Sequence, residues 1–320
     1  EGPHGCGKTE LLKRSCHEAG AGVIYISVPE DVSLFHNDFA TAVNFRFNER
    51  VSLWDLLVST ISTPEVPDDV YDGTSRTLDV ITVAAAELKR DRGRPVVLVI
   101  DNTARLARRH LPTFELLQDF AKDRADEGTV TVVFSSSEGI VPTILRRRSA
   151  ASRLGDVVNL GDISVDDARR YLMCRGVTDD AVINATIDVT GRRIKLMQEA
   201  SRVLATPGKS LEDVRRKFKL NVVEELTRLD VGTSPGTLTT ARAFGAWNAS
   251  KIVLADGFVT FGEFERLFPD KEDRNAVVSS NIFLRRSDEE RIYFQSRPVE
   301  DFMRAKLATH APRIGGRTTR

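Results

Sequence analysis

Three features of the sequence predict an α/β fold. Residues 2–9 read Gly-Pro-His-Gly-Cys-Gly-Lys-Thr and fit the pattern G-x-x-x-x-G-K-[ST], whose backbone N–H groups wrap nucleotide phosphates. Hydrophobic strands then alternate with helical segments to about residue 160, which is typical of a doubly wound parallel sheet. Helical patterns and a hairpin follow. The predicted class is therefore a P-loop NTPase sheet with a helical lid and a C-terminal winged-helix-like domain.

The phosphate loop is expected to lead into a helix. Thr9 opens a run of helix formers that stops before Gly20 and Gly22, so unpaired N–H groups and the positive end of the helix dipole face the anion. Lys8 is expected to reach the β- and γ-phosphates. The sequence has no Asn-Lys-x-Asp guanine motif, and this favours ATP over GTP. The residues expected to contact the nucleotide are Gly2, Pro3, His4, Gly5, Cys6, Gly7, Lys8, Thr9 and Glu10.

A phosphate loop normally hangs from the carboxyl end of a buried strand. No residues precede Glu1 to form one. We therefore expect the first strand of the sheet to be missing and the chain to be a piece of a longer protein.

A second strand carries the candidate metal carboxylate. Residues 94–101 form a continuous apolar run that ends in Asp101, as a parallel strand buried on both faces would. A carboxylate there holds Mg²⁺ through its waters, while the loop hydroxyl of Thr9 ligates the ion. The alternative is that Asp101 caps a turn; its pairing with the phosphate loop favours magnesium.

Two polar positions bear on hydrolysis. Asn102 stands where many ATPases of this class carry Glu or Asp. An amide cannot act as a base, although it can orient a water by hydrogen bonding. Hydrolysis is therefore expected to be slow, assisted from elsewhere, or absent. Ser136 follows the strand at residues 129–134 and is expected to contact the γ-phosphate or its water, the alternative being a Ser-rich turn. Residues 23–28 and 157–160 are predicted to add two strands.

Composition limits the possible partners. The 46 Lys and Arg residues balance 46 Asp and Glu residues, so overall charge gives no reason to expect nucleic acid or an anionic membrane. No run approaches the roughly 20 apolar residues of a membrane span. Cys6, Cys16 and Cys174 are sparse and odd in number, which favours a reducing, intracellular compartment. The spacing of His4, Cys6, Cys16 and His17 matches no zinc site.

The chain is predicted to divide into a core at 1–162, a helical lid at 163–232, a winged-helix-like domain at 236–310 and a basic, disordered tail at 311–320. Ser164 is the expected N-cap of the first lid helix. The predicted hairpin at 282–286 and 291–295 carries Arg285, Arg286 and Arg291, but acidic residues 288–290 occupy its tip and oppose phosphate. A protein-contact module is therefore favoured over a DNA reader.

Together, these features resemble the AAA+/STAND group of Walker A and Walker B ATPases. Within that group the chain resembles the ATPase region of the mitochondrial escape protein family, in the stretch Pro95–Asn102, in residues 160–164, and in Gly191-Arg192-Arg193 followed by Leu196. The resemblance implies an ATPase and a mitochondrial location. It also implies that Arg153, or one of its rivals Arg146–Arg148, contacts the γ-phosphate bound by a neighbouring copy; the alternative is a basic surface loop. The resemblance further implies that Arg192 or Arg193 senses nucleotide at the lid.

The sequence thus predicts an ATP-binding molecular switch with Mg²⁺ as cofactor, in which hydrolysis by water changes the orientation of the lid and the winged helix. The alternative is a non-hydrolysing scaffold or effector that recruits protein or nucleic acid through the winged helix, and Asn102 keeps it open. The expected partners are nucleotide and either another protein or a second copy of the chain.

Overall fold

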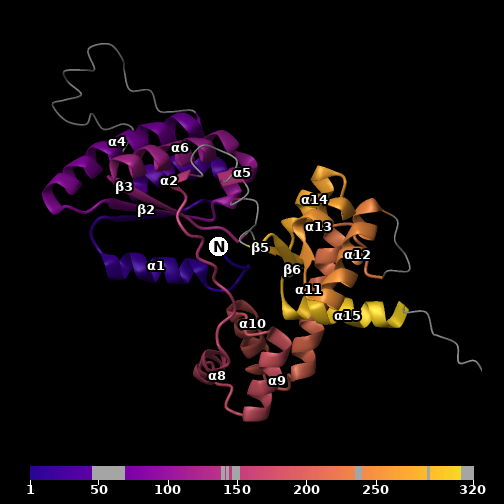
Figure 1. Ribbon diagram of the computed structural model, residues 1–320. Coiled ribbons are helices and arrows are strands. Elements are labelled where there is room, and N and C mark those ends of the chain that lie inside the picture. The colour runs from indigo at the N-terminus through magenta and orange to yellow at the C-terminus, as the bar shows by residue number, and fades with distance from the viewer. Residues whose placement is uncertain are drawn as a thin grey trace, which may run out of the picture. The chain divides into compact units, whose positions relative to one another are not determined.

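The computed structural model describes residues 1–44, 69–137, 141, 144–145, 152–234, 240–286 and 289–310. It divides the chain into two compact units (Figure 1). The first consists of Glu1 and Lys8–Val157, and the second of Gly2–Gly7 and the chain from Val158 onward.

The first unit is built on a parallel sheet with strand order β1-β2-β3. The strands are β1 (Val23–Ser27), β2 (Val96–Asp101) and β3 (Val130–Phe134). The central strand β2 is almost entirely buried, and its Val-Val-Leu-Val-Ile run suits that position because β-branched side chains pack well between neighbouring strands. The register places Ser27 beside Asp101. The polar strand ends therefore meet at the carboxyl edge of the sheet.

Helices cover both faces of this sheet (Figure 1). Helix α1 (Lys8–Ala19) lies on one face with no fully buried residue, whereas α4 (Val70–Arg92) and α6 (Leu111–Glu127) lie on the other. The main core forms between β2, α4 and α6, with Leu98, Ile81 and Phe114 at its centre. The remaining elements of the unit are η1 (Val32–Leu34), α2 (Phe35–Ala42) and α5 (Ala104–Arg109).

The predicted strand at residues 157–160 is wrong. This segment has no regular secondary structure, although its sequence resembles that of the strands. A strand needs a neighbour that completes its hydrogen-bond ladder, and no described strand pairs with these residues.

The second unit begins with four helices: α8 (Val165–Cys174), α9 (Asp180–Thr190), α10 (Ile194–Leu204) and α11 (Leu211–Arg228). The predicted N-cap of α8 is confirmed, because the Ser164 side chain accepts a hydrogen bond from the Asp167 N–H at 3.0 Å. Leu172, Ile183 and Met197 form a small core among α8, α9 and α10.

The C-terminal part of this unit combines helices with a small sheet. Its elements in order are α12 (Ala241–Asp256), β4 (Val259–Thr260), α13 (Phe261–Leu267), α14 (Lys271–Val278), β5 (Phe283–Arg286), β6 (Arg291–Phe294) and α15 (Arg297–His310). The strands are antiparallel in the order β4-β6-β5, so the predicted hairpin is confirmed. Trp247 and Phe264 lie in its core. The predicted tail, residues 311–320, lies outside the described residues. Among the described helices, none combines the length and apolar character that crossing a bilayer requires.

Candidate nucleotide-binding site

The structure brings the end of the phosphate loop and the predicted metal carboxylate together. Thr9 lies in the first turn of α1, and Asp101 is the last residue of β2. The Thr9 Oγ1 hydroxyl donates a hydrogen bond to Asp101 Oδ2 at 2.6 Å, across 92 positions of sequence. Hydroxyl and carboxylate oxygens are the ligands that Mg²⁺ prefers, so this pair fits a magnesium ion.

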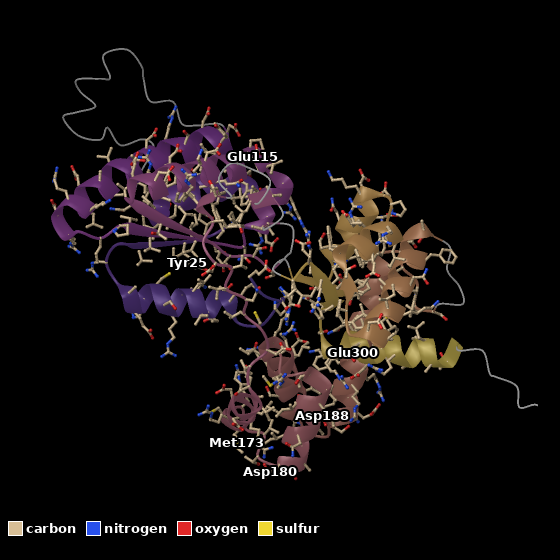
Figure 2. The ribbon with its side chains drawn as sticks, in the orientation of Figure 1. Tyr25, Glu115, Met173, Asp180, Asp188 and Glu300 are labelled. Carbon is tan, nitrogen blue, oxygen red and sulfur yellow. The ribbon has the colours of Figure 1, made fainter. Side chains whose placement is uncertain are left out.

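Two further donors hold the Asp101 carboxylate, which is only 1% exposed. The backbone N–H of Asn102 donates to Oδ1 at 2.9 Å, and the Tyr25 hydroxyl donates to Oδ2 at 3.2 Å. Tyr25 lies on β1 (Figure 2). Burial and then the nearby negative charge of Asp101 raise the pKa of Tyr25 above its ordinary value, so the phenol stays protonated and remains a donor. Sequence reasoning missed this residue.

Asn102 adopts a left-handed backbone conformation, with φ at +59°. Most L-residues pay roughly 1–2 kcal/mol for that conformation, whereas Asn tolerates it. Its Nδ2 donates to Ser27 Oγ at 2.9 Å. The side chain at this predicted catalytic position is therefore fixed by a hydroxyl on β1.

The serines after β3 are both buried. Ser136, the predicted γ-phosphate contact, is 3% exposed. Its neighbour Ser135 accepts two hydrogen bonds at its carbonyl from Thr103, at 3.0 and 2.9 Å. The Ser135 Oγ is buried without a partner within the described parts of the chain. A buried hydroxyl with unmet hydrogen-bonding capacity thus lies next to the residue that the sequence indicated.

The first part of the phosphate loop, Gly2–Gly7, groups with the second unit and leads directly into Lys8, the first residue of α1. Gly5 has φ at +79°, and a Cβ there would lie 2.5 Å from the Lys195 side chain. The backbone N–H of Lys195 donates to the Gly5 carbonyl at 3.1 Å. Glycine is thus required at position 5 both for its backbone conformation and for this close approach.

The other predicted loop contacts differ in exposure. Pro3 and Cys6 are buried, whereas His4 and Glu10 are exposed. Their roles toward a nucleotide stay predictions.

Of the two predicted lid arginines, Arg193 binds the phosphate loop. It is only 6% exposed, forms an ion pair with Asp162, and donates to the carbonyl oxygens of His4 at 3.1 Å and Gln295 at 3.0 Å. Arg192 is half-buried, with a left-handed φ of +67°. The guanidinium of Arg193 thus joins the loop, the segment before α8 and the residue after β6.

Arg153 is paired within its own unit. Its Nε and Nη2 donate to the two carboxylate oxygens of Asp126 at 2.8 and 3.0 Å. Asp126 lies in the last turn of α6, where the chain enters β3, so it marks the amino edge of the sheet, opposite Asp101. From there Arg153 does not reach a nucleotide at its own Asp101. Its rivals Arg146–Arg148 lie outside the described residues.

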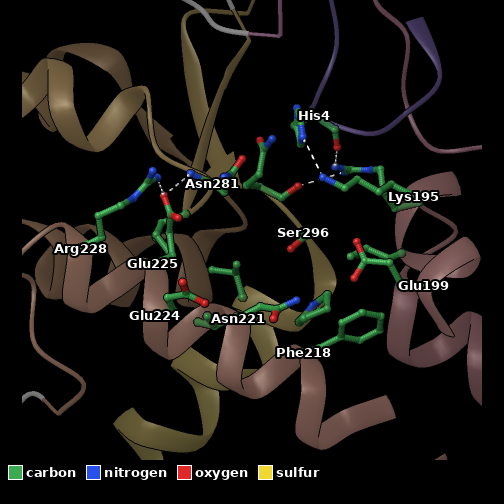
Figure 3. Close-up of a pocket in the computed structure, with 17 residues that line it drawn as sticks. His4, Lys195, Glu199, Phe218, Asn221, Glu224, Glu225, Arg228, Asn281 and Ser296 are labelled. Atoms are coloured by element: carbon green, nitrogen blue, oxygen red, sulfur yellow. Dashed lines mark hydrogen bonds and ion pairs between the residues drawn. The ribbon is translucent and has the colours of Figure 1, made fainter. Parts of the chain in front are cut away.

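The second unit also contains a cavity of about 330 Å³ lined by α10, α11, the end of β6 and the start of α15 (Figure 3). Lys195 Nζ lies 3.0 Å from His4 Nε2 at its rim, and Phe218 and Ser296 line it. The carboxylates and cations of its lining are mixed, so the cavity has no single charge preference.

The arginines of the hairpin are neutralised by acidic neighbours. Arg285 is 9% exposed, pairs with Glu290 at 2.8 Å and stacks on the Phe261 ring at 3.5 Å. Arg286 and Arg291 both pair with Glu289, at 2.9 and 3.6 Å. These cations are thus already engaged by carboxylates.

Residues 1–144 match the family model described as AAA domain. The match covers the part of the chain that contains the phosphate loop and the Thr9–Asp101 contact, so this part is similar to an AAA domain. The search of curated proteins returned no match. The resemblance to the mitochondrial escape protein family, and the location that it implies, stay sequence-based predictions.

Among solved structures, the chain is similar to the Walker-type ATPase PABY2304 of Pyrococcus abyssi, with 14% identity and a TM-score of 0.56 over 95% of this chain and 89% of that one. This similarity shows a shared fold. Two structures of the replication initiator DnaA, each 16% identical, have lower scores. The one bound to AMPPCP and single-stranded DNA has a TM-score of 0.39, covering 86% of this chain and 78% of that one. AMPPCP-bound DnaA from Aquifex aeolicus has 0.37, covering 97% and 87%.

Proposed function

We propose that this chain binds ATP with Mg²⁺ and acts as a nucleotide-dependent switch. The observation that carries the proposal is the 2.6 Å hydrogen bond between Thr9 and Asp101, because it joins the end of the phosphate loop to a buried carboxylate. Lys8 would neutralise the β- and γ-phosphates. Thr9 and Asp101 would hold Mg²⁺, which would supply further charge neutralisation to the phosphates.

The proposed chemistry is hydrolysis of the γ-phosphoanhydride. The oxygen of a water forms a bond to the γ-phosphorus, and the bond to the β,γ-bridging oxygen breaks. The proton that the water loses passes to a γ-phosphate oxygen or to solvent, and ADP and inorganic phosphate leave. Asn102 supplies no base, but its amide can orient the water by hydrogen bonding. We therefore expect slow turnover.

The proposed output of the switch lies in the second unit. The order α12, β4, α13, α14, β5, β6 supports a winged-helix domain. Because carboxylates already neutralise Arg285, Arg286 and Arg291, a protein partner or a second copy is a better candidate than DNA. Arg153 could serve a second copy, since it lies at the edge of the sheet opposite Asp101.

The test of nucleotide binding is Lys8→Ala, measured with labelled ATP on the whole chain. We expect at least a tenfold loss of affinity. Arg14→Ala, which removes an exposed cation from the same helix, is the control and should bind as wild type does. Equal affinity of Lys8→Ala and wild type would refute the proposal.

A non-hydrolysing scaffold is the second candidate, and Asn102 is the observation that favours it. Single-turnover release of phosphate separates the two candidates. The scaffold is excluded if the wild type releases phosphate, Asp101→Ala does not, and the exposed-site control Asp91→Ala does. Asn102→Asp is the sharper companion variant, because Asp tolerates the left-handed backbone that Glu does not. If hydrolysis is limited by the missing carboxylate, this variant should be faster than wild type.

A further inference from the structure

We infer that Tyr25 and Ser27 are positioning residues that orient Asp101 and Asn102 for metal binding and hydrolysis. The inference rests on the proposed nucleotide function and names residues that neither the motifs nor the family match assign. We call these two side chains the β1 hydroxyl pair.

The strand places both hydroxyls on one face. Residues two apart in a strand point the same way, and the parallel register sets Ser27 directly beside Asp101. The β1 hydroxyl pair therefore lies along the carboxyl edge where the nucleotide site is proposed. Neither residue is needed to fill the core there, since both are only partly buried.

Each hydroxyl of the pair contacts one of the two functional residues. Asn102 Nδ2 donates to Ser27 Oγ at 2.9 Å, and the Tyr25 hydroxyl donates to Asp101 Oδ2 at 3.2 Å. The same carboxylate oxygen also accepts a hydrogen bond from Thr9.

These contacts fix two functional groups. Asp101 Oδ2 is held between two O–H donors, Thr9 and Tyr25, so the carboxylate is set in one rotamer before a metal ion arrives. The Asn102 Nδ2 donates a hydrogen bond to Ser27, and Oδ1 therefore remains as the acceptor for a water. Ser27 of the β1 hydroxyl pair thus orients the Asn102 amide toward a water.

The test uses Tyr25→Phe and Ser27→Ala in the whole chain. The primary readout is the Mg²⁺ concentration that gives half-maximal binding of labelled ATP, and the second is the single-turnover rate. We expect Tyr25→Phe to raise the half-maximal Mg²⁺ concentration about three- to tenfold, the net effect of one hydrogen bond. Ser27→Ala should slow the single turnover by a similar factor, and Ser27→Thr, which keeps the hydroxyl, should restore it.

The control is Tyr71→Phe, which removes the same hydroxyl from a 38% exposed site on α4 and should change nothing. ATP affinity in EDTA should stay at the wild-type value in all variants. Wild-type Mg²⁺ dependence in Tyr25→Phe would overturn the inference while leaving the proposed function intact. A parallel loss of ATP affinity in EDTA and of melting temperature would also overturn it, because the hydroxyls would then serve only stability. Failure of the wild type to bind ATP would instead refute the proposed function.

Discussion

Replacing Arg193 by Met should destabilise the second unit more than any other single substitution of a charged residue between residues 163 and 232. The Arg193 guanidinium is buried and binds three partners: the Asp162 carboxylate and the carbonyl oxygens of His4 and Gln295. Met retains most of the aliphatic stem, so the decrease in stability measures the lost polar contacts and not lost packing.

The magnitude follows from the burial of the two charges. Removing one member of a fully buried ion pair costs about 3–5 kcal/mol, because the other charge remains buried without a partner. The Asp162 side chain is 27% exposed and regains some water, and this places the expected cost near the lower limit, about 3 kcal/mol. For domains of roughly 150–250 residues, that cost lowers the melting temperature by about 6–12 °C.

Thermal unfolding of the whole chain measures this effect. The chain has two tryptophans, Trp54 and Trp247. A Trp54→Phe background leaves the buried Trp247 as the reporter of the second unit. Arg202→Met is the control, because Arg202 is an exposed residue of α10, the helix that Arg193 precedes. A shift below about 2 °C in Arg193→Met would refute the reasoning, as would strict additivity with Asp162→Asn in a double-mutant cycle.

Three further predictions follow from single positions. Gly5→Ala should reduce ATP affinity at least tenfold, since the new Cβ would meet Lys195 and the left-handed backbone would be strained; a titration with labelled ATP checks this. Asn102→Ala should lower the free energy of unfolding by about 1–2 kcal/mol while Asn102→Gly costs less, as urea denaturation would show. Hydrogen bonds from the Ser210 backbone N–H and Lys209 lower the pKa of Asp213 below its usual 3.8, so its stabilisation of α11 is complete at neutral pH and is lost as the pH falls below about 4. Asp213→Asn should therefore flatten the dependence of the melting temperature on pH between about 5 and 3; an unchanged slope would contradict this assignment.

The sequence predicted elements whose information is local. The phosphate loop and α1 were predicted from a motif and a run of helix formers. Strand β2 was predicted from five apolar residues followed by Asp101. The hairpin was predicted from two short apolar runs around a charged turn. Each of these depends on residues within about ten positions of one another.

What the sequence could not provide is the identity of distant neighbours. Residues 157–160 have a strand-like composition, but a strand forms only where another strand lies beside it. The parallel register was needed to learn that Ser27 lies beside Asp101, so the β1 hydroxyl pair could not be identified from spacing alone. Arg192 and Arg193 are equivalent in sequence, and only the fold shows that the second of them is buried against the loop.

The left-handed backbone at Asn102 has a consequence for how this chain could change over evolution. A single substitution to glutamate would put a long side chain on a turn that its backbone resists. A glutamate base would thus require the turn after β2 to be reshaped first, whereas aspartate could replace asparagine on the existing turn. Lineages that keep this turn are confined to asparagine, aspartate or glycine at that position, and aspartate is the one acidic base among them.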